Sequence, residues 1–121
     1  MEPQFPIRRK GLYLGTEVGE KWWKRYTRDK FFARGNGKYW FDDSAFYFHR
    51  YLTRKPIQIP FDKVVEVKLG RSHAGRWLLR VPVLKIIWKK ADLLLSSGFL
   101  VSKNPLELES ILADIRQRIY A

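Results

Sequence analysis

The sequence has no cysteine and no long apolar run. Without cysteine, neither a disulfide framework nor a thiolate zinc site can form, which is compatible with a reducing compartment. No stretch approaches the roughly 18 consecutive apolar residues of a transmembrane helix, so we expect none. The first residues, MEPQFP, lack the apolar segment of a signal peptide, and we therefore expect a cytoplasmic protein.

Histidine is also scarce, which limits the chemistry available to a catalytic or metal site. His49 and His73 are the only two, and neither lies in a metal-ligand spacing such as HExxH. Ser72 and His73 are neighbours in sequence, but a catalytic triad is assembled in space and not by adjacency. We therefore expect no enzymatic activity, no catalytic residue, no metal and no cofactor.

Positive charge, by contrast, is abundant. The chain has 24 Lys or Arg against 12 Asp or Glu, a net charge of +12. Residues 1–38 carry +6 and residues 39–90 carry +7, whereas residues 91–121 carry −1. Such a field concentrates polyanions such as nucleic acid, anionic lipid or acidic protein surfaces. The alternative is a basic surface that only keeps the protein soluble.

The end of the chain has the pattern of an amphipathic helix over about 105–119. Asn104 suits the N-cap, Pro105 the first helical position and Glu107 the third, a variant of the capping box. Arg116 and Arg118 place positive charge in the last turn, where it favours the helix dipole. Apolar residues recur at steps of three and four and predict one buried face: Leu108, Ile111, Leu112, Ile115 and Ile119.

Before this helix, short β-like runs alternate with turn residues, and the spacing predicts about seven strands. The predicted strands cover 30–34, 38–41, 45–52, 57–59, 64–69, 83–89 and 93–96, the last continuing to Val101 past a bulge at Gly98. Gly35-Asn36-Gly37 is expected to be a hairpin turn because Asn-Gly tolerates positive φ. Val65, Val67 and Leu69 are expected to share one face of their strand.

This order of elements resembles the pleckstrin-homology superfold, particularly its prokaryotic PH-like and GRAM-like branches. The segments that carry the resemblance are Tyr-Trp-Phe-Asp-Asp at 39–43, Phe-Tyr-Phe-His-Arg at 46–50, Ile-Gln-Ile-Pro-Phe-Asp-Lys-Val at 57–64, Val-Leu-Lys-Ile-Ile-Trp at 83–88 and Ser-Gly-Phe at 97–99. The resemblance implies a mainly β (α+β) fold, a bent antiparallel barrel of about seven strands capped by one C-terminal helix. It also implies a binding or scaffolding role.

The resemblance begins at about Lys38, and the region before it carries an additional aromatic and basic segment. We expect residues 21–121 to form a single PH-like domain. Residues 1–20 are expected to be an N-terminal extension that packs on the core or stays loosely ordered.

Two segments are candidates for binding an anion. The loop 70–76 offers Arg71, Ser72, His73 and Arg76 between glycines, and Arg side chains with accessible backbone amides suit phosphate or carboxylate. An ordinary solvated loop is the alternative reading.

The second segment is 21–28, in which cations and aromatics interleave. It offers Lys24, Arg25 and Arg28 for charge, and Trp22, Trp23 and Tyr26 for contact with bases or with a bilayer interface. The competing interpretation is that these aromatic rings pack onto the sheet while the charges stay in water.

Three classes of function remain open on these observations. The first is a non-enzymatic PH-like module that engages an anionic partner, either a phospholipid headgroup or an acidic protein surface, with a peripheral position at the membrane. The second is nucleic-acid binding through the same basic and aromatic residues, although no RNP or helix-turn-helix motif is present. The third is an assembly module that pairs with another chain through a strand edge or the helix.

Overall fold

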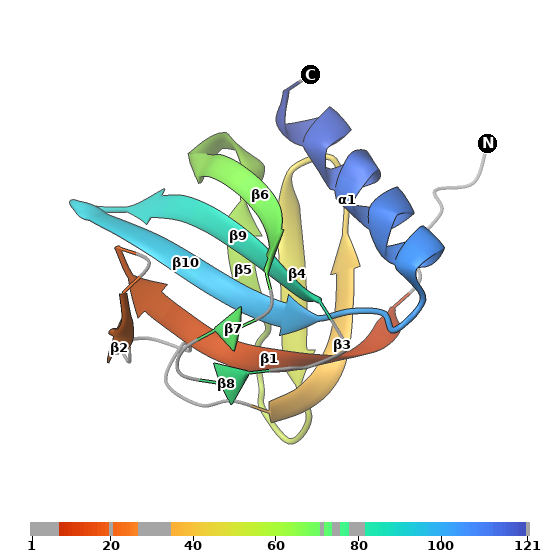
Figure 1. The fold of residues 1–121 in the computed structure, drawn as a ribbon, viewed down its shortest axis with the longest axis horizontal. Helices are drawn as coiled ribbons and strands as arrows, with labels where there is room; N and C mark the ends of the chain where they lie inside the picture. Colours follow the sequence, from red (N-terminus) through yellow and green to blue (C-terminus); the bar gives the residue numbers. More distant parts are fainter. Residues whose placement is uncertain are drawn as a thin grey trace.

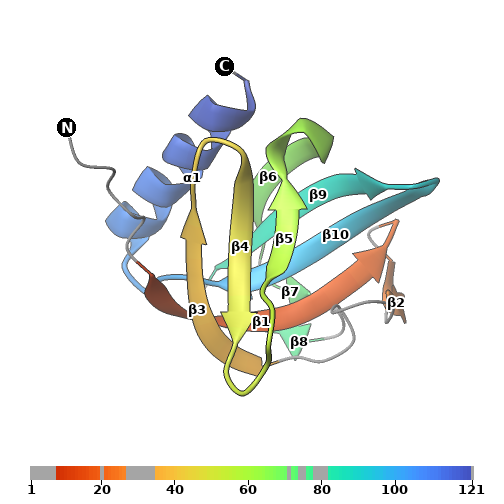
Figure 2. The same ribbon diagram turned by 180° about the vertical axis from the view of Figure 1, so that it is seen from behind.

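The computed structural model describes residues 8–19, 21–26, 35–70, 72–73, 76–77 and 82–120. Among these residues, seven strands follow one another in an antiparallel sheet in the order β5-β4-β3-β1-β10-β9-β6, and one α-helix, α1, packs across it (Figures 1 and 2). Among the described residues the two edge strands, β5 and β6, do not pair with each other, so the sheet is bent but not closed. The mainly β, PH-like fold with a C-terminal helix is confirmed.

The elements have the following bounds. In the main sheet they are β1 (Arg9–Val18), β3 (Gly35–Phe41), β4 (Ala45–Arg50), β5 (Ile57–Pro60), β6 (Val64–Gly70), β9 (Val83–Lys90) and β10 (Leu93–Leu100). Strand β2 (Lys21–Arg25) pairs with β1 beside this path, and β7 (Ser72–His73) pairs with β8 (Arg76–Trp77) in a separate two-stranded sheet. A short 3₁₀ helix, η1, covers Phe61–Lys63, and α1 covers Pro105–Ile119.

Strand β1 lies in the middle of the sheet, between β3 and β10. The sequence predicts that residues 1–20 are an N-terminal extension that packs on the core or stays loosely ordered. Within the described part of that range, residues 9–18 form β1, in which Tyr13 and Leu14 are fully buried. The glycines at 11 and 15 obscure the strand pattern in the sequence. The strand predicted at 30–34 lies outside the described residues, and β1 brings the count in the main sheet to seven.

The predicted hairpin turn at residues 35–37 is wrong. These three residues begin β3 and pair with β1, with Gly35 opposite Tyr13 and Gly37 opposite Gly11. Glycine is needed at position 37 for the close approach of the β3 and β4 backbones and not for a turn. A Cβ there would lie 2.2 Å from the backbone oxygen of His49.

Two irregularities in strand pairing also differ from the sequence prediction. The register of β6 against β9 shifts between Val64 and Glu66, which turns Val65 toward solvent while Val67 stays buried. Opposite Gly98 the irregularity lies in β1 and not in β10, because Leu14 is the additional residue between Tyr13 and Gly15.

The helix forms over the predicted residues. The Asn104 side chain accepts hydrogen bonds from the backbone N–H groups of Leu106 and Glu107, as expected for an N-cap. The Asn104 N–H donates to Ser102 Oγ, at 3.0 Å. Arg116 donates to the backbone oxygen of Val67 through Nε and Nη2, at 3.2 and 2.9 Å, and so joins the helix to β6. The buried face consists of Leu108, Ile111, Leu112 and Ile115.

A matched pair of glycine variants tests the close approach at the start of β3. We expect Gly37→Ala to lower the free energy of unfolding by at least about 2 kcal/mol, because the added methyl group meets rigid β4 backbone. Gly35→Ala should change it by no more than about 0.5 kcal/mol, since its nearest contact is the flexible end of Arg50, at 3.7 Å. Urea denaturation measures both, and equal effects of the two variants would contradict the prediction.

Candidate functional site

The predicted anion-binding loop at 70–76 overlaps the β7–β8 pair. Ser72 lies opposite Trp77 and His73 opposite Arg76. Arg71 lies outside the described residues. The pairing places the backbones of Ser72, His73 and Arg76 side by side, and anion binding by this group remains a prediction.

The predicted aromatic and basic segment forms β2 beside the end of β1. Lys24 is exposed, and Arg25 lies opposite Glu17 in the strand pairing. Tyr26 donates its backbone N–H to Thr16 O at 2.8 Å and is only 8% exposed, within the core cluster. Packing onto the sheet is therefore the role that the structure describes for the Tyr26 ring. Of the other predicted contacts, Trp22 and Trp23 belong to β2, whereas Arg28 lies outside the described residues.

A basic surface that the sequence analysis did not assemble covers β1, β3 and β4 on the side away from the core. We call it the outer basic face, and it consists of Arg8, Lys10, Lys38, Trp40, Tyr47 and His49. Lys38 is flanked by Lys10 on β1 and by His49 on β4, so three basic residues form a row across three strands. The core side of the same strands carries fully buried Phe46 and Phe48, as the alternation in the sequence predicts.

Aromatic rings order one end of this face. Trp40 and Tyr47 stack with their centroids 5.2 Å apart and their planes 10° from parallel. The Arg8 guanidinium lies over the Trp40 ring, 4.3 Å from its centroid, in a cation–π contact. Tyr47 Oη donates to Asp42 Oδ2 at 3.3 Å. The stack therefore holds Arg8 against the sheet at the start of β1.

Asp42 organises the turn between β3 and β4. Its Oδ1 accepts hydrogen bonds from the Ser44 N–H, the Ser44 hydroxyl and the Ala45 N–H, at 2.8, 2.8 and 2.9 Å. Partial burial by itself would raise the pKa of Asp42. The hydrogen bonds from Ser44, Ala45 and Tyr47 favour the charged form more strongly, and the pKa of Asp42 lies below its usual value.

The β4–β5 loop, residues 51–56, borders the outer basic face and presents apolar side chains to solvent. Leu52 is fully exposed and Tyr51 is 49% exposed. Leu52 also has a φ of 66°, a left-handed conformation that is costly for a leucine. Hydrogen bonds stabilise the loop: among them, the Thr53 hydroxyl donates to Arg50 O at 2.7 Å, and His49 Nε2 donates to Thr53 O at 2.7 Å.

A hollow of about 240 Å³ lies between this loop and the outer basic face. No Asp or Glu is among its lining residues, which are Arg8, Lys38, Trp40, His49, Arg50, Tyr51, Leu52 and Thr53. Three further hollows on the described part of the chain each include at least one carboxylate. The hollow at the β4–β5 loop therefore differs from these three in having cationic side chains and no carboxylate in its lining.

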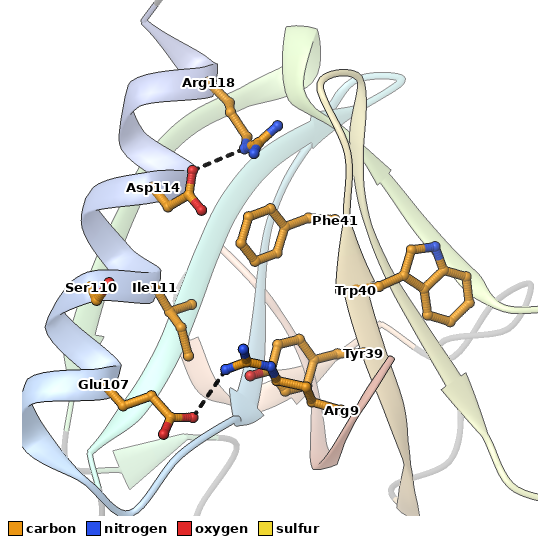
Figure 3. A pocket seen from close by; sticks show the side chains of 9 residues that line it. All are labelled: Arg9, Tyr39, Trp40, Phe41, Glu107, Ser110, Ile111, Asp114 and Arg118. Atoms are coloured by element: carbon orange, nitrogen blue, oxygen red, sulfur yellow. Dashed lines mark hydrogen bonds and ion pairs between the residues drawn. The ribbon is translucent and has the colours of Figure 1, made fainter. Parts of the chain in front are cut away.

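The groove between α1 and β3 illustrates the difference (Figure 3). Arg9 pairs with Glu107 at 3.4 Å at one end, and Arg118 pairs with Asp114 at 3.1 Å and with Asp43 at the other. Tyr39 and Phe41 point toward the helix, whereas Trp40 points away from it. The charges of this groove are largely paired within the protein, so it offers little net attraction to an ion.

Tyr39 at the floor of the same groove shows the effect of burial. Desolvation of its phenol raises the pKa of Tyr39 above its usual value, although the neighbouring Arg9 opposes the increase. Tyr39 Oη donates to Val101 O at 3.4 Å, which links β3 to the segment before the helix. The neutral phenol is thus part of the packing.

Comparison with known proteins assigns the family. A family model described as Bacterial PH domain-like matches residues 2–113, and the chain belongs to that family. No curated protein matches the chain. The match begins before β1, in agreement with the central position of that strand in the sheet.

Two other kinds of site are not found among the residues that the structure describes. No helix among them is both long and apolar enough to cross a membrane. Within the same residues, no group of three or more His, Asp or Glu side chains is placed to hold a metal ion.

The pH dependence of stability tests the role of Asp42. Because the pKa of Asp42 is lowered by folding, its charged form stabilises the fold above the unfolded-state pKa of about 4, and this contribution is lost as the pH falls through the folded-state pKa. At neutral pH we expect Asp42→Asn to lower the free energy of unfolding by about 1 kcal/mol, a difference that shrinks below about pH 4. Urea denaturation at several pH values measures it.

The matched control is Asp92→Asn, which removes an exposed carboxylate from the β9–β10 turn. That variant should retain the acid-dependent loss of stability seen in the unmodified chain. The role given to Asp42 would be wrong if the two variants had the same pH profile.

Proposed function

We propose that this PH-like domain is a non-enzymatic binding module that engages an anionic lipid surface through the β4–β5 loop and the outer basic face beside it. The observation that carries the proposal is the exposed pair Tyr51 and Leu52 at a loop tip within a basic surface. A large apolar side chain held in solvent gains about 1.5–3 kcal/mol when it is buried.

The backbone of the loop supports this interpretation. A leucine in the left-handed region costs roughly 1–2 kcal/mol relative to its usual conformations, and Leu52 contributes no core packing in return. Asn or Gly would satisfy the same turn more cheaply. A leucine at this position is explained if its side chain acts outside the folded chain.

The positive charge around the β4–β5 loop indicates which kind of apolar environment Tyr51 and Leu52 would enter. Arg50, Arg54 and Lys55 flank Tyr51 and Leu52 in the sequence, and no Asp or Glu occurs between residues 44 and 60. Cations gain roughly 1 kcal/mol each near an anionic bilayer, and Tyr is favoured at the bilayer interface. An apolar tip within a ring of cations therefore matches the headgroup region of an anionic membrane.

The basic and aromatic segment predicted from the sequence precedes β3 in the chain. Tyr51 donates its backbone N–H to Asn36 O at 3.1 Å, so the chain enters β3 next to the β4–β5 loop. Trp22, Trp23, Lys24, Arg25 and Arg28 precede that point, and we include them as a second contact with the lipid surface. The 70–76 loop, with Arg71, Ser72, His73 and Arg76, is a third candidate contact.

Stacking on nucleic-acid bases is supported less well than lipid contact. Tyr26 is buried, and Trp40 already stacks on Tyr47 beneath the Arg8 guanidinium. Base stacking requires an aromatic face that is open to the ligand. An acidic protein surface would use the same cations but gains nothing specific from a strained, solvent-exposed leucine.

Vesicle co-sedimentation tests the proposal with a matched pair of leucine variants. Leu52→Asn should weaken binding to vesicles of phosphatidylglycerol and phosphatidylcholine by roughly tenfold or more, because an apolar side chain no longer enters the bilayer. Leu106→Asn is the control, since Leu106 is a 78% exposed leucine on α1, away from the loop. It should bind as the unmodified chain does.

The stability of the same variants separates binding from folding. Asn tolerates the left-handed backbone, so Leu52→Asn should leave the free energy of unfolding unchanged or raise it by up to about 1 kcal/mol. Equal vesicle binding by the Leu52 and Leu106 variants would overturn the proposal. So would binding to generic oligonucleotides that is stronger than binding to anionic vesicles at the same salt concentration.

A further inference from the structure

The Lys10–Lys38 pair on the outer basic face is unfavourable for folding. Lys38 lies directly opposite Lys10 on one side and His49 on the other. Like charges on directly opposed residues of a sheet destabilise it. Residues 8–16, 35–41 and 44–60 contain no Asp or Glu. Of the carboxylates next to these segments, Glu17 is buried, and Asp42 accepts hydrogen bonds from Ser44, Ala45 and Tyr47.

The hollow beside this row is bounded by groups whose positions are determined by other contacts. The stack of Trp40 on Tyr47 holds the Arg8 guanidinium, and the His49 ring holds the loop through its bond to Thr53 O. Lys38 projects from the sheet between them and is exposed. Three permanent cations, Arg8, Lys38 and Arg50, therefore line a preformed space of about 240 Å³.

We propose that this hollow binds the phosphate group of a phosphomonoester, with Arg8 and Lys38 as its charge partners. A phosphate accepts paired hydrogen bonds from the fork of an arginine and a further one from the point charge of a lysine. Because a phosphomonoester carries close to two negative charges near neutral pH, it offsets the repulsion in the row better than a carboxylate, which carries one.

The phosphate site rests on the proposed function and adds a specific ligand to it. Tyr51 and Leu52 line the hollow and would place it at the level of lipid headgroups. It differs from the two segments that the sequence suggested for anion binding, residues 21–28 and 70–76. The same phosphate chemistry occurs in a lipid headgroup and in a soluble phosphomonoester, and binding of phosphate itself requires no membrane.

Titration of the full chain with inorganic phosphate, followed by NMR at constant ionic strength, tests the site. We expect saturable shifts in the amide signals of Lys38, Trp40 and His49. Lys38→Met and Arg8→Met should each weaken phosphate binding by roughly ten- to a hundredfold, the effect of losing one charge-assisted hydrogen bond. Lys103→Met is the control, because it removes the same charge from an exposed position next to the helix N-terminus.

Stability provides an independent measurement on the same variants. Relief of the Lys10–Lys38 repulsion means that Lys38→Met should unfold at the same urea concentration as the unmodified chain or at a higher one. If Lys38 acted only to stabilise the fold, Lys38→Met would lower the urea concentration at the midpoint of unfolding. Amide shifts that do not saturate with phosphate, or an equal loss of phosphate affinity in Lys38→Met and Lys103→Met, would show that only net charge matters. Either result would overturn the proposed phosphate site.

Vesicles distinguish the two sources of the phosphate group. Stronger binding to phosphatidic acid than to phosphatidylglycerol at equal surface charge supports the site and identifies a lipid phosphomonoester. Equal binding to the two, together with saturable binding of inorganic phosphate, supports the site and identifies a soluble phosphomonoester. Loss of vesicle binding in Leu52→Asn tests the proposed function separately, since that substitution leaves Arg8 and Lys38 in place.

Discussion

The pairing of β1 with both β3 and β10 is the constraint on which the rest of this structure depends. The first half of β1 pairs with β3 and the second half with β10, and Leu12 and Tyr13 pair with both of these strands. The additional residue Leu14 follows immediately, where the sheet changes direction. Tyr13 contacts Phe48 from one half and Phe99 from the other, with ring centroids 6.1 and 5.3 Å apart. One strand therefore joins two sheet halves and their shared core.

A bent sheet of this kind leaves an apolar interior that needs a cover, and α1 provides it. The helix buries one face against the core, while Arg116 bonds to the backbone of β6 and the Arg9–Glu107 and Arg118–Asp43 pairs tie its two ends to the other sheet half. Most polar groups on this side are thereby used within the fold. The groove beside the helix accordingly has few charges left for a ligand.

The opposite side of β1, β3 and β4 has the reverse character. Its cations face one another across the strands, and its loop holds a leucine in a costly conformation in full contact with water. Neither feature improves folding, whereas both become favourable against an anionic surface with an apolar interior. The proposed lipid contact and the proposed phosphate site rest on this single contrast between the two sides of the sheet.

The sequence by itself determined the elements whose signals are local: the helix with its Asn104 cap, the alternation of Phe46 and Phe48 with Tyr47 and His49, the absence of thiol chemistry and the excess of positive charge. Only the tertiary structure decided that residues 9–18 form the central strand, that Gly37 serves close packing, and that Arg8, Lys38 and His49 meet beside Leu52. The physical reason is that strand neighbours are chosen by pairing between distant segments. Local periodicity shows which face a side chain occupies, but not which side chains share that face.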